Sequence, residues 1–140
     1  MKYLYTATVT TMGGRNGHVQ SDNNVLDFEV RMPTGLGGAN NEYTNPEQLF
    51  AAGYSACFGS ALDLAISKSK VKTGTTSVTS KVSLGQTEEG GYKLAVEMLV
   101  NIPDVSLEKA QELADFAHQI CPYSNATRGN IEVVIKASNN

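Results

Sequence analysis

The sequence predicts a single α+β domain in which antiparallel strands pack against a long central helix. Three features lead to this class: strand-like alternation near the N-terminus, an apolar run over residues 46–68, and a second pair of alternating segments after it. The expected order β-β-β-α-β-β-α-β lacks the regular alternation of a parallel doubly wound sheet, which favours antiparallel pairing. With 140 residues, of which 41% are hydrophobic, we expect one globular domain over residues 1–140.

The N-terminal segment is predicted to form a three-stranded meander. Strands are expected at residues 3–10, 18–20 and 25–32, where β-forming residues alternate. A glycine-rich turn around Arg15 separates the first two strands, and the glycine-rich residues 33–41 predict a loop.

The apolar run is predicted to be a helix buried inside the protein. Asn45 can cap its first turn, and Pro46 suits the first helical position. As far as Lys68 the run is apolar nearly all round and rich in small residues, which permit close approach of other backbones. Its length would allow a membrane span, but Asp63 and several Ser and Gly residues argue against one.

The second half is predicted to contain a β-hairpin, a helix and a last strand. Residues 77–86 and 91–102 alternate on either side of a short turn that contains glycine. Ser106 can cap a helix with one apolar stripe, and Pro122 is expected to end it. The last strand is expected at residues 131–137.

The charge balance and the N-terminus limit the classes of partner and location. A net charge of -3 gives no basic excess, so we expect neither a nucleic acid nor a membrane surface as partner. The first residues lack the basic and apolar regions of a secretory signal, and we therefore expect a cytoplasmic protein.

Two cysteines, Cys57 and Cys121, are the residues best suited to carry chemistry. In a reducing cytoplasm such a pair is either redox-active or simply packed in the core. Cys57 lies midway along an apolar helix, as a packing residue would, whereas Cys121 lies at a helix end, where a side chain can be presented at an edge. An attacking thiol must be ionised, and an ordinary thiol with a pKa near 8.5 is mostly protonated at neutral pH.

Arg15 and Glu47 are the candidates to assist such a thiol. A guanidinium can stabilise a thiolate and donate to a hydroperoxide oxygen, although an arginine in a turn can also be merely solvated. Glu47 lies in the first turn of the central helix, where the helix dipole alone favours a carboxylate. Alternatively, Glu47 holds Arg15 in a bidentate pair and, if a hydroperoxide is the reactant of the thiol, accepts a hydrogen bond from it.

Metal and nucleotide cofactors have little support. His118 could join Cys57 and Cys121 in a zinc site, but the chain has no Cys-x-x-Cys and no second clustered histidine. No glycine pattern follows a strand and opens a helix as a nucleotide-binding loop does. We expect no cofactor.

Three motifs together resemble a known family. They are Gly13-Gly14-Arg15, the run Asn-Pro-Glu-Gln-Leu-Phe-Ala-Ala-Gly-Tyr-Ser-Ala-Cys-Phe at 45–58, and the run Cys-Pro-Tyr-Ser-Asn-Ala-Thr-Arg-Gly-Asn at 121–130. Over nearly the whole chain the sequence resembles the organic hydroperoxide resistance (Ohr) branch of the Ohr/OsmC family. The sister OsmC branch shares the fold and the cysteines, and the run after Cys121 and the Arg15 turn favour the Ohr branch.

The resemblance implies an intimate homodimer that reduces alkyl and fatty-acid hydroperoxides to alcohols without metal, flavin or haem, as a protection against oxidative stress. By position, Cys57 matches the peroxidatic cysteine, Cys121 the resolving cysteine, and Arg15 and Glu47 the assisting pair. The implied cycle passes through a sulfenic acid on Cys57 and a disulfide with Cys121, which a dithiol, notably a lipoylated protein, reduces.

The apolar run also suggests a substrate preference and a shared active site. We expect Phe50, Tyr54 and Phe58 to surround Cys57 and to bury the alkyl chain of a bulky hydroperoxide. On one helix, the ten residues from Glu47 to Cys57 advance about 15 Å and turn through about 1000°. We therefore expect Glu47 and Arg15 to serve Cys57 of the other subunit.

Two other functions compete with a peroxidase. The same two thiols would suit a redox-responsive sensor, and buried, inert cysteines would suit a plain dimeric interaction domain. Steady turnover of peroxide under a dithiol separates the enzyme from both.

Overall fold

The computed structural model describes residues 1–140 and divides the chain into two compact units, Met1–Leu49 and Phe50–Asn140. One long helix, α1 (Pro46–Ser69), begins in the first unit and continues through the second. The α+β class is confirmed. That the whole chain forms a single domain stays a prediction.

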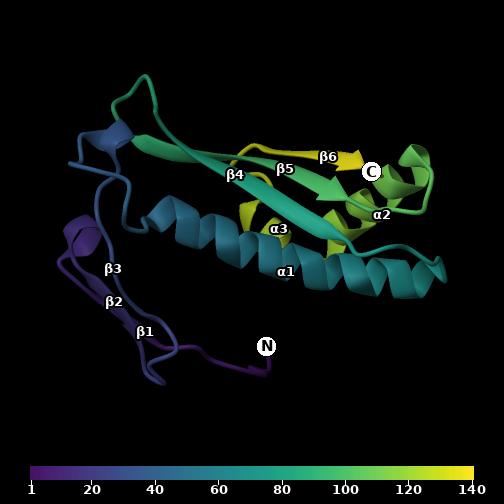
Figure 1. Cartoon of the computed structure of the whole chain (residues 1–140), viewed down its shortest axis with the longest axis horizontal. Helices are drawn as coiled ribbons and strands as arrows, with labels where there is room; N and C mark the ends of the chain where they lie inside the picture. Colours follow the sequence, from purple (N-terminus) through teal and green to yellow (C-terminus); the bar gives the residue numbers. More distant parts are fainter. The chain divides into compact units, whose positions relative to one another are not determined.

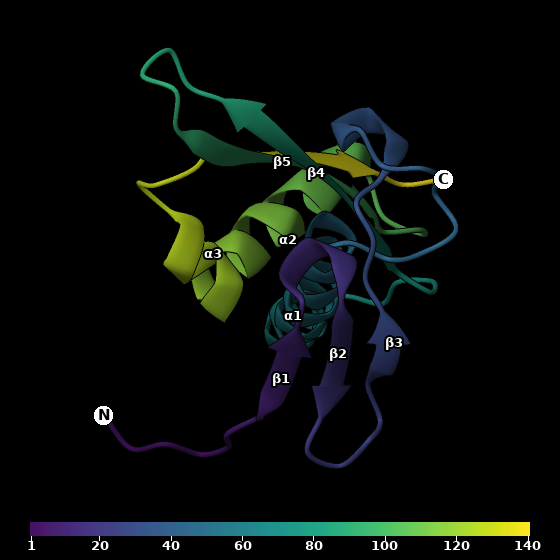
Figure 2. The same ribbon diagram turned by 90° about the vertical axis from the view of Figure 1, so that its left-hand side faces the viewer.

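The first unit is an antiparallel meander with the order β1-β2-β3, as expected (Figure 2). Its elements are β1 (Val9–Met12), the 3₁₀ helix η1 (Gly14–Asn16), β2 (His18–Ser21), β3 (Asp27–Glu29) and the 3₁₀ helix η2 (Thr34–Leu36). β1 begins at Val9 and not at residue 3. The reason is that β2 ends at Ser21, the register partner of Val9, so the preceding residues have no strand to pair with.

β3 is also shorter than the predicted 25–32, because its first two residues belong to the turn. The side chain of Asn23 accepts a hydrogen bond from the backbone N–H of Val25, and the Ser21 hydroxyl accepts one from that of Leu26. These side-chain bonds hold the backbone in a turn and replace the ladder that a strand would need.

The second unit combines the rest of α1 with a three-stranded sheet and two further helices. They are β4 (Ser77–Gln86), β5 (Tyr92–Asn101), α2 (Leu107–Ile120), α3 (Pro122–Thr127) and β6 (Val133–Ser138). The β4–β5 hairpin lies at the expected residues, and α1 and α2 lie on the same side of the sheet (Figure 1).

Two features of the second unit differ from the prediction. β6 pairs in parallel with β5, not antiparallel to it, because the chain returns through α2 and α3 and such a long crossover allows parallel pairing. Pro122 ends α2 as expected, but it also starts the unpredicted α3. Proline lacks the backbone N–H that a first helical residue leaves unbonded, so it suits that position.

The two long helices begin at the predicted caps. The side chain of Asn45 accepts a hydrogen bond from the backbone N–H of Gln48 at 2.9 Å. The Ser106 hydroxyl accepts one from the backbone N–H of Lys109 at 3.2 Å. Each cap stabilises its helix by about 1 kcal/mol, which explains why the sequence marks both starts well.

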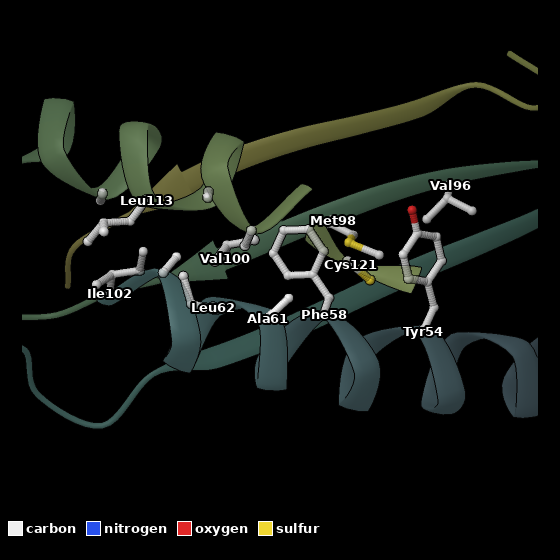
Figure 3. Packing of buried hydrophobic residues seen from close by; sticks show 14 residues of the cluster. Tyr54, Phe58, Ala61, Leu62, Val96, Met98, Val100, Ile102, Leu113 and Cys121 are labelled. Carbon is white, nitrogen blue, oxygen red and sulfur yellow. The ribbon is translucent and has the colours of Figure 1, made fainter. Parts of the chain in front are cut away.

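The core of the second unit lies between α1, β5 and α2 (Figure 3). The buried face of α1 consists of Tyr54, Phe58, Ala61, Leu62 and Ala65, and it packs against Val96, Met98 and Val100 of β5 and against Ala110, Leu113, Ala114 and Ala117 of α2. Each large side chain in this cluster stabilises the fold by roughly 1.5–3 kcal/mol. Cys121 is part of the same buried cluster.

The expectation that α1 is buried all round is wrong for the single chain. By length and mean hydropathy α1 could span a membrane, but its buried residues belong to the core cluster just described. A second face, formed by Ala52, Ala56, Ser60 and Leu64, is exposed because the sheet and α2 cover only one side of the helix. We call these four residues the open face of α1.

Candidate active site

The two cysteines lie together in the second unit. The Sγ atom of Cys121 is 3.7 Å from the Sγ atom of Cys57, and neither cysteine forms a disulfide. Because an S–S bond is about 2.05 Å long, the two sulfur atoms must approach by less than 2 Å to become bonded. The arrangement can therefore form a disulfide with a small movement.

Cys121 is held by the junction between two helices. Its backbone N–H donates to the carbonyl of Ala117 and closes α2, while its carbonyl accepts from the N–H of Asn125 and opens α3. Between these bonds its backbone is extended, with φ -66° and ψ 124°. This break in helical geometry lets the side chain turn into the core, toward Cys57 on α1.

The exposure of the two thiols is the reverse of what the sequence suggests. Cys121, expected at an accessible edge, is fully buried, whereas Cys57, which resembles a packing residue, is partly exposed. Burial depends on how α2 and α3 pack, which a helix-ending proline does not specify. Cys57 is therefore the thiol that an external reactant reaches first.

The surroundings of Cys57 in the second unit do not favour its ionised form. Burial raises the pKa of the Cys57 thiol, the backbone N–H of Tyr123 lowers it, and Cys121 raises it again. The net pKa is above the ordinary value. A nucleophilic Cys57 therefore requires an additional positive charge beside it.

Arg15 and Glu47 form the expected bidentate pair in the first unit. The two guanidinium nitrogens donate to the two carboxylate oxygens at 2.9 Å (Nη1 to Oε2) and 2.6 Å (Nη2 to Oε1). Hydrogen bonding to Arg15 holds the pKa of Glu47 below its ordinary value, and the same bond raises the pKa of Arg15. The Arg15 side chain remains 34% exposed and that of Glu47 14%, so the guanidinium is fixed but still accessible.

Glycine is required in the turn that carries Arg15. Gly13 adopts φ +78°, in the left-handed region that favours glycine. At Gly17 an added Cβ would lie only 1.7 Å from the carbonyl oxygen of Met12. The turn can therefore close on η1 and present Arg15 only if these positions have no side chain.

Aromatic side chains near Cys57 are arranged differently from the prediction. Tyr54 and Phe58 are fully buried, so they belong to the core and do not form an open substrate surface. Phe50 is half-buried and Tyr123 is exposed, and the centroids of the two rings are 6.4 Å apart. Tyr123, which was not predicted as a site residue, packs over Gly53, where an added Cβ would lie 3.0 Å from the tyrosine hydroxyl.

A polar network adjoins the cysteines, and no pattern in the sequence predicts it. The Tyr54 hydroxyl lies 3.0 Å from the Ser124 hydroxyl and 3.1 Å from that of Thr127. His118 bonds the Ser124 hydroxyl through Nδ1 at 2.8 Å. Burial, together with the charge of Arg128, lowers the pKa of His118, which favours the neutral ring.

His118 thus bonds a serine and does not complete a zinc site with the cysteines. No group of three or more His, Cys, Asp or Glu side chains comes together in a way that could hold a metal ion.

Comparison with known proteins gives a consistent group of relatives. A family described as OsmC-like protein matches residues 38–136. The chain is 48% identical to the organic hydroperoxide resistance protein OhrB of Bacillus subtilis over 134 residues, covering 95% of this chain and 97% of that protein. It is 47% identical to an organic hydroperoxide resistance protein of Xanthomonas axonopodis pv. citri, covering 96% of this chain and 94% of that one.

Solved structures agree with these relatives. The crystal structure of an organic hydroperoxide resistance protein from Elizabethkingia anophelis, with thiocyanate bound, has 66% identity and a TM-score of 0.95, covering all of both chains.

Proposed function

The chain belongs to the OsmC-like family, and on this premise we propose that it is a cysteine-based peroxidase that reduces organic hydroperoxides to alcohols. The observation that carries the proposal is the 3.7 Å separation of the Cys57 and Cys121 sulfur atoms, with one thiol partly exposed and the other buried. Cys57 can thus react with an external oxidant, and Cys121 can then form a disulfide with the oxidised Cys57.

In the proposed cycle Cys57 attacks and Cys121 resolves. The Cys57 thiolate attacks one oxygen of the hydroperoxide, an S–O bond forms as the O–O bond breaks, and the leaving alkoxide takes a proton to become an alcohol. Cys121 then attacks the sulfenic sulfur, and an S–S bond forms as hydroxide leaves and is protonated to water. A dithiol, in our proposal that of a lipoylated protein, restores both thiols by exchange and becomes a disulfide itself.

Arg15 and Glu47 assist the first step in this proposal. Since burial raises the pKa of Cys57, a permanently charged guanidinium beside it would stabilise the thiolate and donate to the peroxide oxygen. The bidentate bond to Glu47 supports this role, because it fixes the orientation of the guanidinium while leaving part of it accessible.

The proposed working form is a homodimer in the cytoplasm. The open face of α1 and the exposed N-terminal residues Tyr3, Leu4 and Tyr5 provide apolar surface that a second copy of the chain would cover. A cytoplasmic location suits a cycle whose disulfide must be reduced again after every turnover.

A steady-state assay tests the proposed function. With dihydrolipoamide as reductant, we expect sustained consumption of cumene hydroperoxide and a kcat/KM roughly ten- to a hundredfold above that for hydrogen peroxide, because only the larger substrate buries apolar surface. A sensor would be oxidised once without turnover, and an inert protein would leave both thiols unchanged. Equal kcat/KM for the two peroxides would refute the substrate class.

A further inference from the structure

The hydrogen bonds of Tyr54 connect the two chain segments that carry the cysteines. Tyr54 lies one helical turn before Cys57 on α1, and Ser124 lies one turn after Cys121 on α3. Their hydroxyl oxygens are 3.0 Å apart. His118, one turn before Cys121 on α2, bonds the same Ser124 hydroxyl at 2.8 Å. The three side chains thus join α1, α2 and α3 around the two sulfur atoms.

Most of the network is buried, with His118 half-buried at its edge. Tyr54 and Ser124 are fully buried, Thr127 is nearly so, and no buried side-chain polar atom of the protein lacks a hydrogen-bond partner. The two polar side chains that α3 buries, Ser124 and Thr127, both bond the Tyr54 hydroxyl. A helix of only six residues has little stability of its own, so these bonds fix its position on α1.

We propose that Tyr54, Ser124 and His118 form a positioning clamp that holds Cys121 against Cys57 and thereby promotes disulfide formation over further oxidation of Cys57. The inference rests on the proposed function and adds to it three residues that form no hydrogen bond with either sulfur atom. It follows from three distances. The Ser124 hydroxyl lies 3.0 Å from the Tyr54 hydroxyl and 2.8 Å from Nδ1 of His118, and the two sulfur atoms lie 3.7 Å apart.

The clamp matters because two reactions compete for the sulfenic acid on Cys57. Attack by Cys121 forms the S–S bond and releases water, whereas attack by the sulfenic sulfur on a second hydroperoxide gives a sulfinic acid and one more alcohol. Only the first reaction depends on where Cys121 lies. Loss of the clamp lets α3 move, lowers the effective concentration of Cys121 at Cys57, and shifts the outcome toward sulfinic acid.

Tyr54→Phe is the variant that tests the clamp, because it removes only the hydroxyl and keeps the ring in the core. Ser124→Ala removes the shared partner of Tyr54 and His118 and serves as the second variant. The matched control is Ser55→Ala, which removes a 2.8 Å hydrogen bond from the next residue of α1 to Ser80 on β4. Each variant loses a hydroxyl hydrogen bond, part-buried at Ser55 and buried at Tyr54 and Ser124, but only Tyr54→Phe and Ser124→Ala alter the clamp.

The first measurement is the equilibrium of the Cys57–Cys121 disulfide with reduced and oxidised glutathione, resolved by mass spectrometry. For Tyr54→Phe and Ser124→Ala we expect the effective concentration of the two thiols to fall by about tenfold, since each hydrogen bond contributes a severalfold factor. Ser55→Ala should match the wild type. The second measurement is the sulfinic fraction on Cys57 after excess cumene hydroperoxide, which should rise in the two clamp variants while the rate of the first oxidation stays unchanged.

The outcomes separate this inference from the proposed function. A wild-type protein that forms no Cys57–Cys121 disulfide in either measurement contradicts the proposed function. A wild-type protein that forms it, with folded clamp variants equal to Ser55→Ala in both readouts, overturns the clamp alone. If neither clamp variant has a cooperative thermal transition while Ser55→Ala does, the network is needed for folding and the positioning role is also refuted.

Discussion

Cys121 directs its buried thiol at the partly exposed thiol of Cys57 across 3.7 Å. The two sulfur atoms are chemically alike, so the different roles proposed for them depend on which thiol a reactant reaches first. A reactant from solvent reaches the half-buried Cys57 before the buried Cys121, and in the proposed cycle Cys121 reacts only with the oxidised form of Cys57.

The first prediction is that replacing Cys57 and replacing Cys121 block different steps of peroxide reduction. Cys57→Ser should lower peroxide reduction by roughly 10³-fold or more, because no other residue supplies the attacking sulfur. Cys121→Ser should still allow one oxidation of Cys57 but no disulfide. Mass spectrometry after one equivalent of cumene hydroperoxide checks both. A sulfenic acid on Cys121 with Cys57 still reduced would reverse the assignment.

The second prediction concerns the turn that carries Arg15. Gly17→Ala should reduce kcat/KM by about 10²-fold, because the new Cβ would collide with the carbonyl of Met12 and displace the guanidinium. Gly35→Ala is the control within the same unit, since a Cβ there meets nothing within 4 Å. Steady-state kinetics with cumene hydroperoxide measure the difference. Wild-type activity in Gly17→Ala would exclude a catalytic part for the Arg15 turn.

The third prediction is a pH dependence of stability that arises from Glu47. Hydrogen bonding to Arg15 lowers the pKa of this carboxylate from an ordinary 4.5. A group whose folded-state pKa is depressed stabilises the protein above its unfolded-state pKa and loses this contribution as the pH falls through the folded-state pKa. The melting temperature should therefore decrease below about pH 4.5, more steeply in the wild type than in Glu47→Gln.

Arg15→Met is the control for this pH effect, because it removes the partner and keeps the carboxylate. Thermal unfolding followed by circular dichroism from pH 7 to pH 3 should give both variants the same shallow profile. A wild-type profile in Arg15→Met would show that another group shifts Glu47.

The parts of the fold that could be predicted are those set by residues close together in the sequence, such as turns and helix caps. The β4–β5 hairpin follows from alternation around one turn, and α1 and α2 begin at the capping side chains of Asn45 and Ser106. The direction of β6 could not be predicted, since it depends on the path of α2 and α3. The Ohr/OsmC resemblance drawn from three motifs is confirmed by relatives of about 47% identity over nearly the full length.

The sequence allowed the candidate site residues to be named, but not their exposure or most of their contacts. The Arg15–Glu47 pair could be expected because a guanidinium and a carboxylate carry opposite charges and can form two parallel hydrogen bonds. The exposure of the two cysteines was predicted in the wrong order, and the bonds of Tyr54 to Ser124 and Thr127 join residues about 70 positions apart. Contacts of that range depend on tertiary packing, which leaves no periodic pattern in a single sequence.

The fourth prediction is that Glu47 of one subunit serves Cys57 of the other. α1 is one helix from Pro46 to Ser69, and on a regular α-helix ten residues advance about 15 Å. The open face of α1 carries small residues that would allow two such helices to pack closely about a two-fold axis. In that arrangement each site takes its sulfur atoms from one chain and its Arg15–Glu47 pair from the other.

Mixing Cys57→Ser subunits with Glu47→Ala subunits tests this prediction, once subunit exchange has been confirmed by native mass spectrometry. Each homodimer has two defective sites, but a heterodimer combines the intact Cys57 of one chain with the intact Glu47 of the other. With random exchange, half of the dimers are mixed and have one wild-type site, so activity should recover to about a quarter of the wild-type value. If Glu47 and Cys57 must belong to the same chain, no mixed dimer contains a wild-type site, and the activity of the mixture stays at the average of the two mutant homodimers.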